Sequence, residues 1–490
     1  MKRMPVTHLQ SLEKIVSLAK ARGFIFQSSE IYGGLGAVYD YGPLGVELKR
    51  NIRDVWWTEM TRRHDNIVGV DASIFMHPRV WEASGHVEGF NDPMIDDKQS
   101  KRRYRADMLI EQHIEKLRQD GKEEEADEAQ SLLDTAGSRE GLCEDLYKII
   151  MDLEIRGPDS GAFDWTEVRQ FNLMFKTQFG AVSSGDNSDT VYLRPETAQG
   201  IFVNYKNVLD TSRQQIPFGI AQTGKAFRNE VVARQFVFRM REFEQMEMQY
   251  FVEPGKDEET YEEWLEKRQL WHQSIGIRPE FLRAEPHPEE KLAHYARAAA
   301  DIQYRFPIGW QEVEGVHNRT DFDLSQHQEF SGKKLEYYDQ ASKQRYIPYV
   351  VETSIGLDRC IMMVLCDAYR EEIVEGETRT VLKMHPKLAP IRAGIFPLVK
   401  KPELQELARS IEEDLREDYN VLYDESGSIG KRYRRLDEAG TPFCITVDFD
   451  GLEDRTVTVR YRDDMSQERI SVDRLSEVIR KESANWSPGD

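Results

Sequence analysis

The chain has 490 residues, 39% of them hydrophobic, which is enough for two or three domains with sizeable cores. Its formal net charge of −21 excludes a protein that coats nucleic acid non-specifically, because such binding depends on neutralising phosphates. No apolar run approaches the roughly 18 residues that a membrane-spanning helix needs, and no apolar signal segment follows the first residues, so we expect a soluble cytoplasmic protein with no membrane partner.

The N-terminal part is predicted to contain two helices separated by a glycine loop. Residues 8–22 have helical character, and residues 32–45 (YGGLGAVYDYGPLG) lack the strand–GxGxxG–helix context of a nucleotide fingerprint. Tight turns between packed aromatic residues and a direct role in binding both remain open for this loop. Residues 46–63 have apolar residues at steps of three and four, which predicts an amphipathic helix: Leu48, Ile52, Val55, Trp56 and Met60. A strand that ends at Pro78 should follow.

Composition divides the rest of the chain into core segments and charged segments. Residues 96–160 are charged and helix-prone, which is typical of an insertion, and residues 254–300 form a second, smaller charged stretch within the core. We therefore predict a core made of residues 1–95 and 161–375, with 96–160 inserted into it. Residues 371–390 should be a linker to a compact unit of residues 390–490.

The C-terminal unit alternates between segments with strand periodicity and segments with helical periodicity. A strand at 391–399 precedes an amphipathic helix, and further strands are expected at 420–423, 443–449 and 455–461. This order predicts a mixed sheet covered by helices. The helix carries its apolar residues on one face: Leu404, Leu407, Ile411 and Leu415.

Two segments predict chemistry rather than structure. Phe227–Glu230 (FRNE) and Arg241–Glu247 (REFEQME) read as two strands joined by a loop. Side chains alternate along a strand, so Arg228 and Glu230 should share one face. By the same rule Phe243, Gln245 and Glu247 should share a face over about 13 Å. An arginine, a flat ring, an amide and a carboxylate in a row suit a phosphate, an aromatic base and a small cation.

A second arginine is predicted to meet an anion. Glu352–Arg359 (ETSIGLDR) reads as a strand that ends at Gly356, followed by an apolar helix with Arg359 in its first turn. Burial of an unpaired arginine is costly, so Arg359 needs an anionic partner.

Five motifs occur in order along the chain: RPETAQGIF, FRNE…REFEQME, RTDFDL, ETSIGLDR and GKRYRRLDEAGTP. Together they resemble the glycyl-tRNA synthetases of the homodimeric class II type, over nearly the full length. The resemblance implies an α+β catalytic core with an antiparallel sheet flanked by helices, followed by an α/β anticodon-binding domain. It also implies activation of glycine with ATP, transfer of glycine to the 3′ end of tRNA(Gly), and a homodimer.

The resemblance assigns roles to particular residues. Arg228 and Arg359 are expected to be catalytic, because they would contact the phosphates. The expected ATP site is Arg228, Asn229, Glu230, Phe238, Arg241, Glu242, Phe243, Glu312, Val313, Gly356, Leu357, Asp358 and Arg359. The expected glycine site is Arg105, Glu196, Phe243, Glu244, Gln245, Met246, Glu247, Glu352, Thr353, Ser354, Ile355 and Gly356, with Arg319 nearby.

Glycine offers only an ammonium and a carboxylate for recognition. A pocket selective for it must bind those groups and leave no room for a side chain, because loss of one methyl contact discriminates by only about 1–3 kcal/mol. Several carboxylates around one ammonium would meet this need. Glu196, Glu247 and Glu352, from three separate motifs, are the expected set.

Metal expectations differ for Mg²⁺ and zinc. Mg²⁺ needs few protein ligands when phosphates supply the rest, and Glu312 is the expected one. The cysteines are scattered without a CxxC pair, and Asp97 and Ser100 stand where related synthetases can carry zinc-binding cysteines, so no zinc is expected. The four are Cys143, Cys360, Cys366 and Cys444.

The basic residues of the anticodon-domain motif are expected to contact tRNA: Lys431, Arg432, Arg434 and Arg435. A solvated surface explains such a run equally well. Two rivals to the ligase remain: a non-catalytic RNA-binding relative, and a class II synthetase for serine, alanine or proline. A side reaction that makes diadenosine polyphosphates is also chemically reasonable, since a second ATP could attack the adenylate.

Overall fold

The structure is a computed structural model that describes residues 9, 11–136, 141–179, 190–230, 235–288, 292–293 and 295–488. The ends of the predicted core and C-terminal unit (1–8 and 489–490), and parts of the predicted stretches 8–22 and 254–300, therefore lie outside the described residues. Among the helices described, none is long and apolar enough to cross a membrane.

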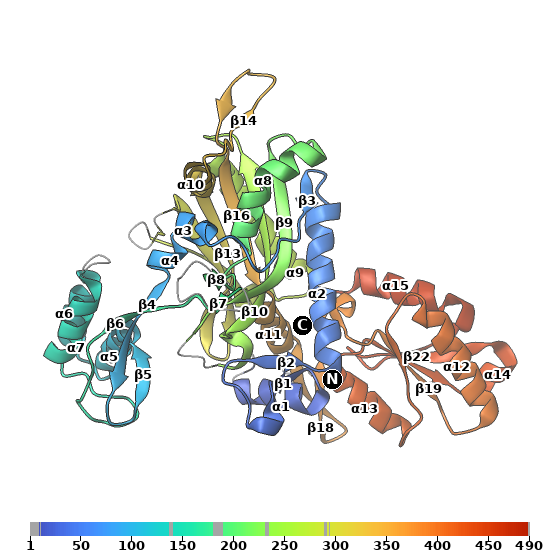
Figure 1. Ribbon diagram of the computed structural model, residues 1–490. Coiled ribbons are helices and arrows are strands. Elements are labelled where there is room, and N and C mark those ends of the chain that lie inside the picture. Colours follow the sequence, from blue (N-terminus) through green and yellow to red (C-terminus); the bar gives the residue numbers. More distant parts are fainter. Residues whose placement is uncertain are drawn as a thin grey trace.

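A seven-stranded sheet forms the centre of the molecule (Figure 1). Its order is β11-β12-β13-β16-β10-β9-β3, and every pair is antiparallel except β3 with β9. The predicted antiparallel core is therefore confirmed, with one parallel strand at its edge. The strands are β3 (Ile67–Gly69), β9 (Phe218–Phe227), β10 (Glu242–Val252), β11 (Leu282–Pro286), β12 (Ala298–Phe306), β13 (Gly309–Thr320) and β16 (Tyr349–Gly356).

Helices cover the two faces of this sheet unequally. One face packs on α2 (Pro43–Arg62), α9 (Asp257–Ser274) and α11 (Leu357–Ala368), which share the largest hydrophobic core. Of the described helices, α8 (Ala198–Ser212) and α10 (Phe322–Ser331) pack in the core on the other face, against one end of the strands. The predicted stripe of α2 is confirmed, since Leu48, Ile52, Trp56 and Met60 are fully buried. The rest of this second face is therefore available for a binding site.

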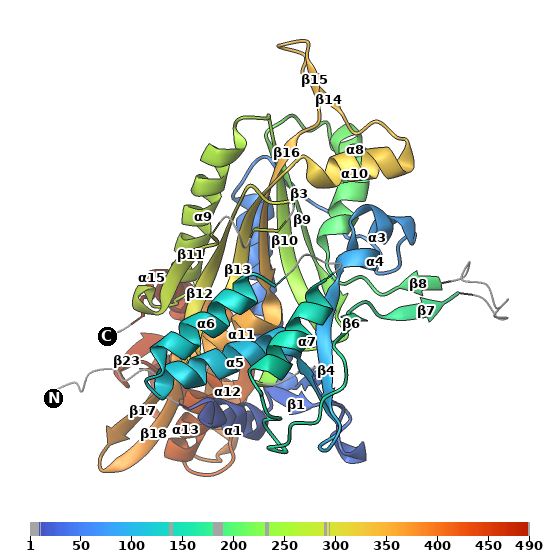
Figure 2. The same cartoon turned by 90° about the vertical axis from the view of Figure 1, so that its left-hand side faces the viewer.

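The charged insertion folds around a core of its own and stands out from the central sheet, to the left in Figure 1 and toward the viewer in Figure 2. A three-stranded sheet in the order β5-β4-β6 packs with three helices. Its strands reach beyond the predicted limits of 96–160 on both sides, because β4 starts at Asn91 and β6 ends at Asn172. The elements are β4 (Asn91–Asp97), β5 (Arg102–Arg105), α5 (Ala106–Gln119), α6 (Glu123–Asp134), α7 (Leu142–Asp152) and β6 (Arg169–Asn172).

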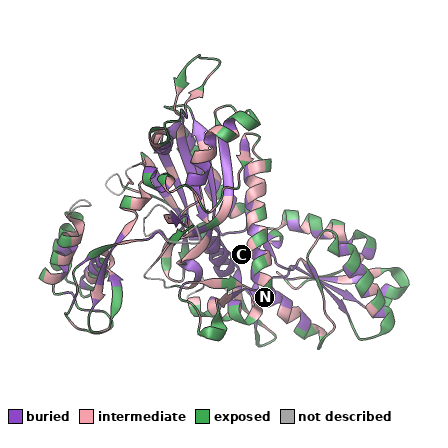
Figure 3. Ribbon diagram, in the orientation of Figure 1, coloured by how far each residue is buried: buried purple, intermediate pink, exposed green. Residues whose placement is uncertain are grey.

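The C-terminal unit is a mixed sheet in the order β20-β19-β21-β22-β23, with buried strands and largely exposed outer helix faces (Figure 3). Parallel pairs join β19 to β20 and β21, and antiparallel pairs join β21, β22 and β23, which confirms the predicted mixed α/β unit. Its elements are β19 (Ala393–Pro397), α12 (Pro402–Arg416), β20 (Val421–Tyr423), α13 (Ile429–Ala439), β21 (Phe443–Val447), α14 (Asp450–Asp454), β22 (Thr456–Tyr461), β23 (Gln467–Ser471) and α15 (Leu475–Asn485).

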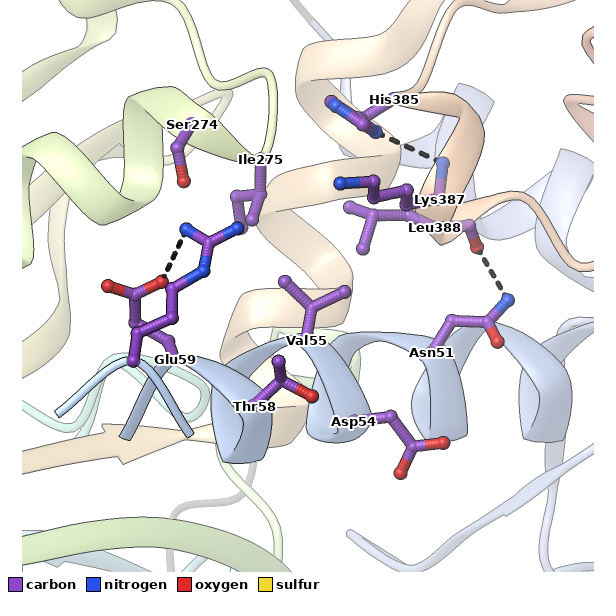
Figure 4. Close-up of a pocket in the computed structure, with 11 residues that line it drawn as sticks. Asn51, Asp54, Val55, Thr58, Glu59, Ser274, Ile275, His385, Lys387 and Leu388 are labelled. Carbon is purple, nitrogen blue, oxygen red and sulfur yellow. Dashed lines mark hydrogen bonds and ion pairs between the residues drawn. The ribbon is translucent and has the colours of Figure 1, made fainter. Parts of the chain in front are cut away.

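A hairpin and a short linker join the core to the C-terminal unit. The segment predicted as linker, 371–390, is largely this hairpin, made of β17 (Tyr369–Val374) and β18 (Glu377–Leu382). After it, the Asn51 amide of α2 donates to the carbonyls of Leu388 (3.2 Å) and Ala389 (3.0 Å), which attaches the linker to α2 (Figure 4). A cavity of about 320 Å³ lies here, between α2, the end of α9 and the linker.

The smaller elements complete the fold. They are α1 (Leu12–Arg22), β1 (Ile25–Gln27), β2 (Tyr39–Tyr41), α3 (Arg79–Ala83), α4 (His86–Gly89), β7 (Lys176–Gln178), β8 (Thr190–Tyr192), β14 (Tyr337–Tyr338) and β15 (Arg345–Tyr346).

Candidate active site

Three carboxylates meet on the partly uncovered face of the central sheet. Glu247 lies in β10, Glu352 lies in the adjacent β16, and Glu196 lies just before α8. Glu247 stands opposite Ser354 in the strand pair, so their side chains share a face. The charges of Glu352 and Glu196 both act on Glu247, so the three form one electrostatic unit.

Each carboxylate has specific polar partners. The Ser354 hydroxyl donates to Glu247 Oε1 (2.9 Å), and the Gln199 amide donates to Glu196 Oε1 (3.0 Å). The Gln249 amide donates to Glu352 Oε2 (2.6 Å). Glu247 Oε2, however, is buried without a hydrogen-bond partner among the described residues. A buried carboxylate oxygen without a partner is costly, so this atom marks where a cationic group would be stabilised.

Positive groups offset most of this negative charge. Arg319 donates to Asp323 (2.7 and 2.9 Å) and to both oxygens of Glu352 (3.3 Å each). His317 Nδ1 lies 2.7 Å from Glu352 Oε1, and His86 Nε2 lies 3.4 Å from Glu196 Oε2. Glu247 has no such cation within ion-pair distance in the part of the chain that the structure describes.

The pKa values of the carboxyls follow from this uneven pairing. Burial, together with the charges of Glu352 and Glu196, raises the pKa of Glu247 to about 8. Burial would also raise the pKa of Glu352, but Arg319 and His317 lower it to about 2. Burial opposes ionisation of Glu196 as well, and His86 and Arg319 overcome it and lower the pKa of Glu196. The cluster therefore combines two ionised carboxylates with one poised to ionise when a cation arrives.

Two arginines lie on aromatic rings next to the carboxylates. The Arg228 guanidinium lies 5.2 Å from the ring centre of Phe243 and 5.4 Å from that of Phe90, and it donates to Pro195 O (3.1 Å). The Arg359 guanidinium lies 4.5 Å from the ring of Phe238. Guanidinium groups on rings beside a set of acids suit oxyanions and a flat base.

The predicted first strand is too long at its end. Strand β9 ends at Phe227; Arg228 N still donates to Arg241 O (2.9 Å), but Asn229 N turns away and donates to Leu173 O (2.8 Å). Arg241 N, which would return the bond to Arg228 in a continued antiparallel pair, donates instead to Ala37 O (2.9 Å), and the Arg241 guanidinium donates to Gly36 O (3.2 Å). The Arg241 Nε also donates to Glu230 O (3.0 Å).

Strand alternation divides the predicted ligand residues of β10 and β16 between two faces. The shared face of Phe243, Gln245 and Glu247 is confirmed: Gln245 lies within hydrogen-bond distance of Thr197 N (3.2 Å) and Ser354 (3.5 Å). The side chains on the other face point away from the cluster, so their predicted ligand contacts stay predictions, which the backbone of these residues could still make. Those residues are Glu242, Glu244 and Met246 of β10, and Thr353 and Ile355 of β16.

The start of α11 shows the same division. Leu357 is fully buried in the core, and Asp358 faces the end of β2 and α2: it accepts from Tyr41 of β2 and lies 3.5 Å from Lys49 Nζ of α2. A Cβ added at Gly356 would lie 3.6 Å or more from the side-chain carbons of Arg359, so Gly356 and Arg359 are direct neighbours. Of the predicted residues here, only Gly356 and Arg359 lie on the side of the site.

A bulge decides which acid of β13 faces Arg359. Glu312 and Glu314 are two residues apart and would share a face in a regular strand. The register with β12 shifts between them, so Val313 is an extra residue that packs in the core. As a result Glu312 pairs with Arg359 Nη1 (2.9 Å), whereas Glu314 is buried against Arg268 (2.5 Å) and His272 (2.8 Å).

Arg105 lies in the insertion, outside the carboxylate cluster. It pairs with Asp92 (3.1 Å) and Asp107 (2.6 Å) at the end of β5. Its predicted contact with glycine stays a prediction.

The predicted tRNA residues of α13 have unequal access to solvent. Arg432 is 3% exposed and donates to the carbonyls of Pro397, Glu425 and Gly427 (2.6–3.2 Å), so its prediction as a tRNA contact is wrong. These bonds hold the Arg432 side chain inside the unit, where its guanidinium satisfies buried backbone carbonyls. Lys431, Arg434 and Arg435 are accessible, and they stay predictions.

Sequence reasoning missed His86, Phe90 and His317 as members of the site. Phe90 and His86 are 5.3 Å apart, ring to ring, and reach the site from the segment that precedes the insertion. Neither lies in a motif with its partners, so only the tertiary structure brings them together. Among the described residues, no group of three or more His, Cys, Asp or Glu side chains is arranged to hold a metal ion.

Comparisons with known proteins agree with this architecture. Residues 175–368 match the family "tRNA synthetase class II core domain (G, H, P, S and T)". Residues 392–482 match "Anticodon binding domain", and residues 92–136 and 122–173 match "Glycyl-tRNA synthetase insertion domain 1". A solved prolyl-tRNA synthetase from Cryptosporidium parvum shares the fold at 14% identity, with a TM-score of 0.61, over 98% of this chain and 78% of its own.

Curated relatives match over almost the whole chain. The glycine–tRNA ligase of Chlorobaculum tepidum is 60% identical over 96% of this chain and 99% of its own length. The glycine–tRNA ligase of Treponema denticola is 51% identical over 98% of both, and that of Alkaliphilus oremlandii is 50% identical over 96% of this chain and 98% of its own. With a matching class II core, insertion and anticodon-binding domain, the chain belongs to the glycine–tRNA ligases, a family of class II aminoacyl-tRNA synthetases.

Proposed function

We propose that this chain activates glycine with ATP, forming glycyl-adenylate and pyrophosphate, and then transfers glycine to the 3′ end of tRNA(Gly). The observation that carries the proposal is the buried Glu247 oxygen without a partner, in a cluster of three carboxylates beside Arg228 and Arg359. Family membership at 50–60% identity supports the same reaction.

In this proposal the glycine ammonium binds Glu247, with Ser354 and Glu196 around it. A cation there would satisfy the free Glu247 oxygen and relieve the repulsion among the acids. Any side chain on the substrate would have to displace groups that are already packed and paired, which excludes alanine and serine by steric overlap and desolvation.

The phosphates of ATP would bind between the two arginines. The glycine carboxylate must attack the α-phosphate, so both anions need neutralisation and alignment. We propose that Arg228 binds at the α-phosphate and that Arg359 binds at the outer phosphates, with adenine on Phe243. Mg²⁺ would neutralise phosphate charge, and Glu312, a carboxylate 45% exposed in its side chain, fits a single protein ligand for it.

The test is ATP–pyrophosphate exchange without tRNA, with glycine, alanine and serine in parallel. Exchange with glycine alone is the expected result, because selection occurs when the amino acid binds. Exchange that is faster with alanine or serine would assign the chain to another amino acid. If folded protein binds tRNA but shows no exchange with any of them, the non-catalytic alternative is correct.

The anticodon-domain helix α13 gives a matched pair of variants. Lys431→Ala is expected to leave thermal stability unchanged and to reduce the salt dependence of tRNA binding by about one unit of slope. Arg432→Ala should instead destabilise the protein by about 2 kcal/mol, because it strands buried carbonyls, with the salt slope unchanged. Thermal denaturation and tRNA titrations at several salt concentrations distinguish the two. If Arg432→Ala lowered the salt slope of tRNA binding, Arg432 would be a tRNA contact and its role as a buried structural residue would be refuted.

We also propose a cytoplasmic homodimer with no membrane partner and no bound zinc. The diadenosine polyphosphate side reaction stays a prediction, for which ATP consumption in the absence of tRNA is the measurement.

A further inference from the structure

A buried ionic junction connects the catalytic core to the anticodon-binding domain. Its core side is the β17–β18 hairpin, which starts at Tyr369, the residue after the end of α11. Its other side is α13, which packs along β18, as Figure 1 shows at the base of the C-terminal unit. The helix that carries Arg359 therefore continues directly into the hairpin that supports α13.

Arg379 of β18 is the central group of this junction. It is 2% exposed, and its Nε donates to Asp437 Oδ2 of α13 (2.8 Å), itself 1% exposed. The same guanidinium donates to Arg462 O (2.6 Å) and to Glu372 of β17 (2.6 Å). One side chain thus binds the core hairpin, the anticodon helix and the end of β22 at once.

The weaker contacts across the junction all depend on the same alignment. Arg434 of α13 donates to Thr378 O (3.1 Å) and Glu377 (2.8 Å), and Arg462 donates to Met384 O (2.8 Å). The Arg434 and Glu377 side chains are exposed by 42% and 75%, so this pair contributes little by itself. The buried Arg379–Asp437 pair is the contact that loses most if the two domains shift, because each buried charge would then lose one of its charged partners, leaving Asp437 with Arg460 and Arg379 with Glu372.

We infer that Arg379 is a positioning residue for the tRNA step: its bond to Asp437 fixes helix α13 of the anticodon-binding domain relative to helix α11 of the catalytic core. Charging a tRNA requires its anticodon end and its 3′ end to be bound at one fixed separation. Activation of glycine needs neither end. The inference rests on the proposed charging of tRNA.

Asp437 supplies an internal control. Arg460 of β22 binds the same carboxylate with two bonds (2.9 and 3.1 Å), but from within the anticodon-binding domain. Arg379→Gln and Arg460→Gln each leave Asp437 with one arginine, and both remove a largely buried guanidinium (2% and 6% exposed). Of these two variants, Arg379→Gln alone removes a bond of Asp437 that crosses between the domains.

The experiment measures charging and exchange on full-length protein at a temperature where each variant is folded. Arg379→Gln is expected to lower kcat/KM for tRNA charging by at least about tenfold, mainly through KM, with glycine-dependent exchange within about twofold of the wild type. Small-angle scattering should show a larger radius of gyration for this variant. Arg460→Gln should lower stability but charge tRNA like the wild type once folded, and Arg379→Lys, which keeps the charge, should recover part of the loss.

Several outcomes would overturn the inference. Equal losses of charging in Arg379→Gln and Arg460→Gln, or a parallel loss of exchange, would mean that the pair only stabilises the fold. Wild-type charging by Arg379→Gln would contradict it directly. If Arg379→Gln does not fold, Arg379→Lys provides the same comparison. Failure of the wild type itself to charge tRNA would refute the proposed function instead, so the two failures are distinguishable.

Discussion

Replacement of Arg228 or Arg359 by alanine is expected to lower kcat/KM for glycine-dependent exchange by about 10²–10³. Both guanidinium groups are preorganised, Arg228 over Phe243 and Arg359 by bonds to Glu312 and Phe238 O (2.9 and 3.3 Å). Each would meet negative charge as the glycine carboxylate approaches the phosphate. Loss of one of them leaves that charge without a donor in the transition state.

The two variants should differ in the substrate that they affect. Arg359→Ala is expected to raise the KM for ATP more than that for glycine, because Arg359 pairs with Glu312 and Phe238 and with none of the three clustered carboxylates. Arg228→Ala should lower kcat as well. Arg305→Ala, at an exposed position of β12, is the control and should stay within about twofold. Exchange by Arg228→Ala at the wild-type rate would exclude Arg228 from the reaction.

The second large effect is a coupling between glycine binding and the protonation of Glu247. The pKa of Glu247 in the free protein is raised to about 8, so the carboxyl is mostly protonated at neutral pH. An ammonium beside it would favour the ionised form, and glycine binding should therefore release a proton. Glycine affinity is expected to rise by up to about tenfold per pH unit between about pH 6 and about pH 8.

Calorimetry in two buffers with different ionisation enthalpies measures the released proton. Glu247→Gln should abolish the proton release and weaken glycine binding, since a neutral amide cannot pair with the ammonium. Ser354→Ala is the matched control, because it removes the hydroxyl on Glu247 Oε1 (2.9 Å) but keeps the carboxyl. Glycine binding with no proton release at pH 7 would show that Glu247 is already ionised or does not bind the ammonium.

The raised pKa of Glu247 also makes the stability of the folded protein depend on pH. A carboxyl whose pKa is higher in the folded state than in the unfolded state favours folding below its unfolded pKa and loses that contribution as pH rises to the folded pKa. Ligand-free protein should thus become less stable as pH rises toward about 8 through Glu247. Glu247→Gln should be relatively more stable than the wild type at the alkaline end, and glycine should restore much of the difference. Thermal denaturation against pH, with and without glycine, is the measurement.

The family, the fold class and most of the chemistry could be predicted from motifs and periodicity in the sequence. Motifs of several residues, such as ETSIGLDR and RPETAQGIF, specify local backbone and side-chain patterns. Such patterns can be recognised without knowledge of the fold. The period of two in β10 placed Phe243, Gln245 and Glu247 on one face, and the structure confirms it. The stripe of α2 was equally readable, because helical periodicity is a local property.

Which of those residues face the site depends on contacts between segments that are far apart in the chain. A single extra residue, Val313, turns Glu314 away from Glu312, and a register shift of this kind has no signal in the sequence of one strand. Strand β9 ends before Glu230, at the point where Arg241 N donates to Ala37 O of a distant turn and does not return the bond that it receives from Arg228. The raised pKa of Glu247 and the Arg379–Asp437 junction likewise depend on groups far apart in the chain, since burial and charge act through space rather than along the sequence.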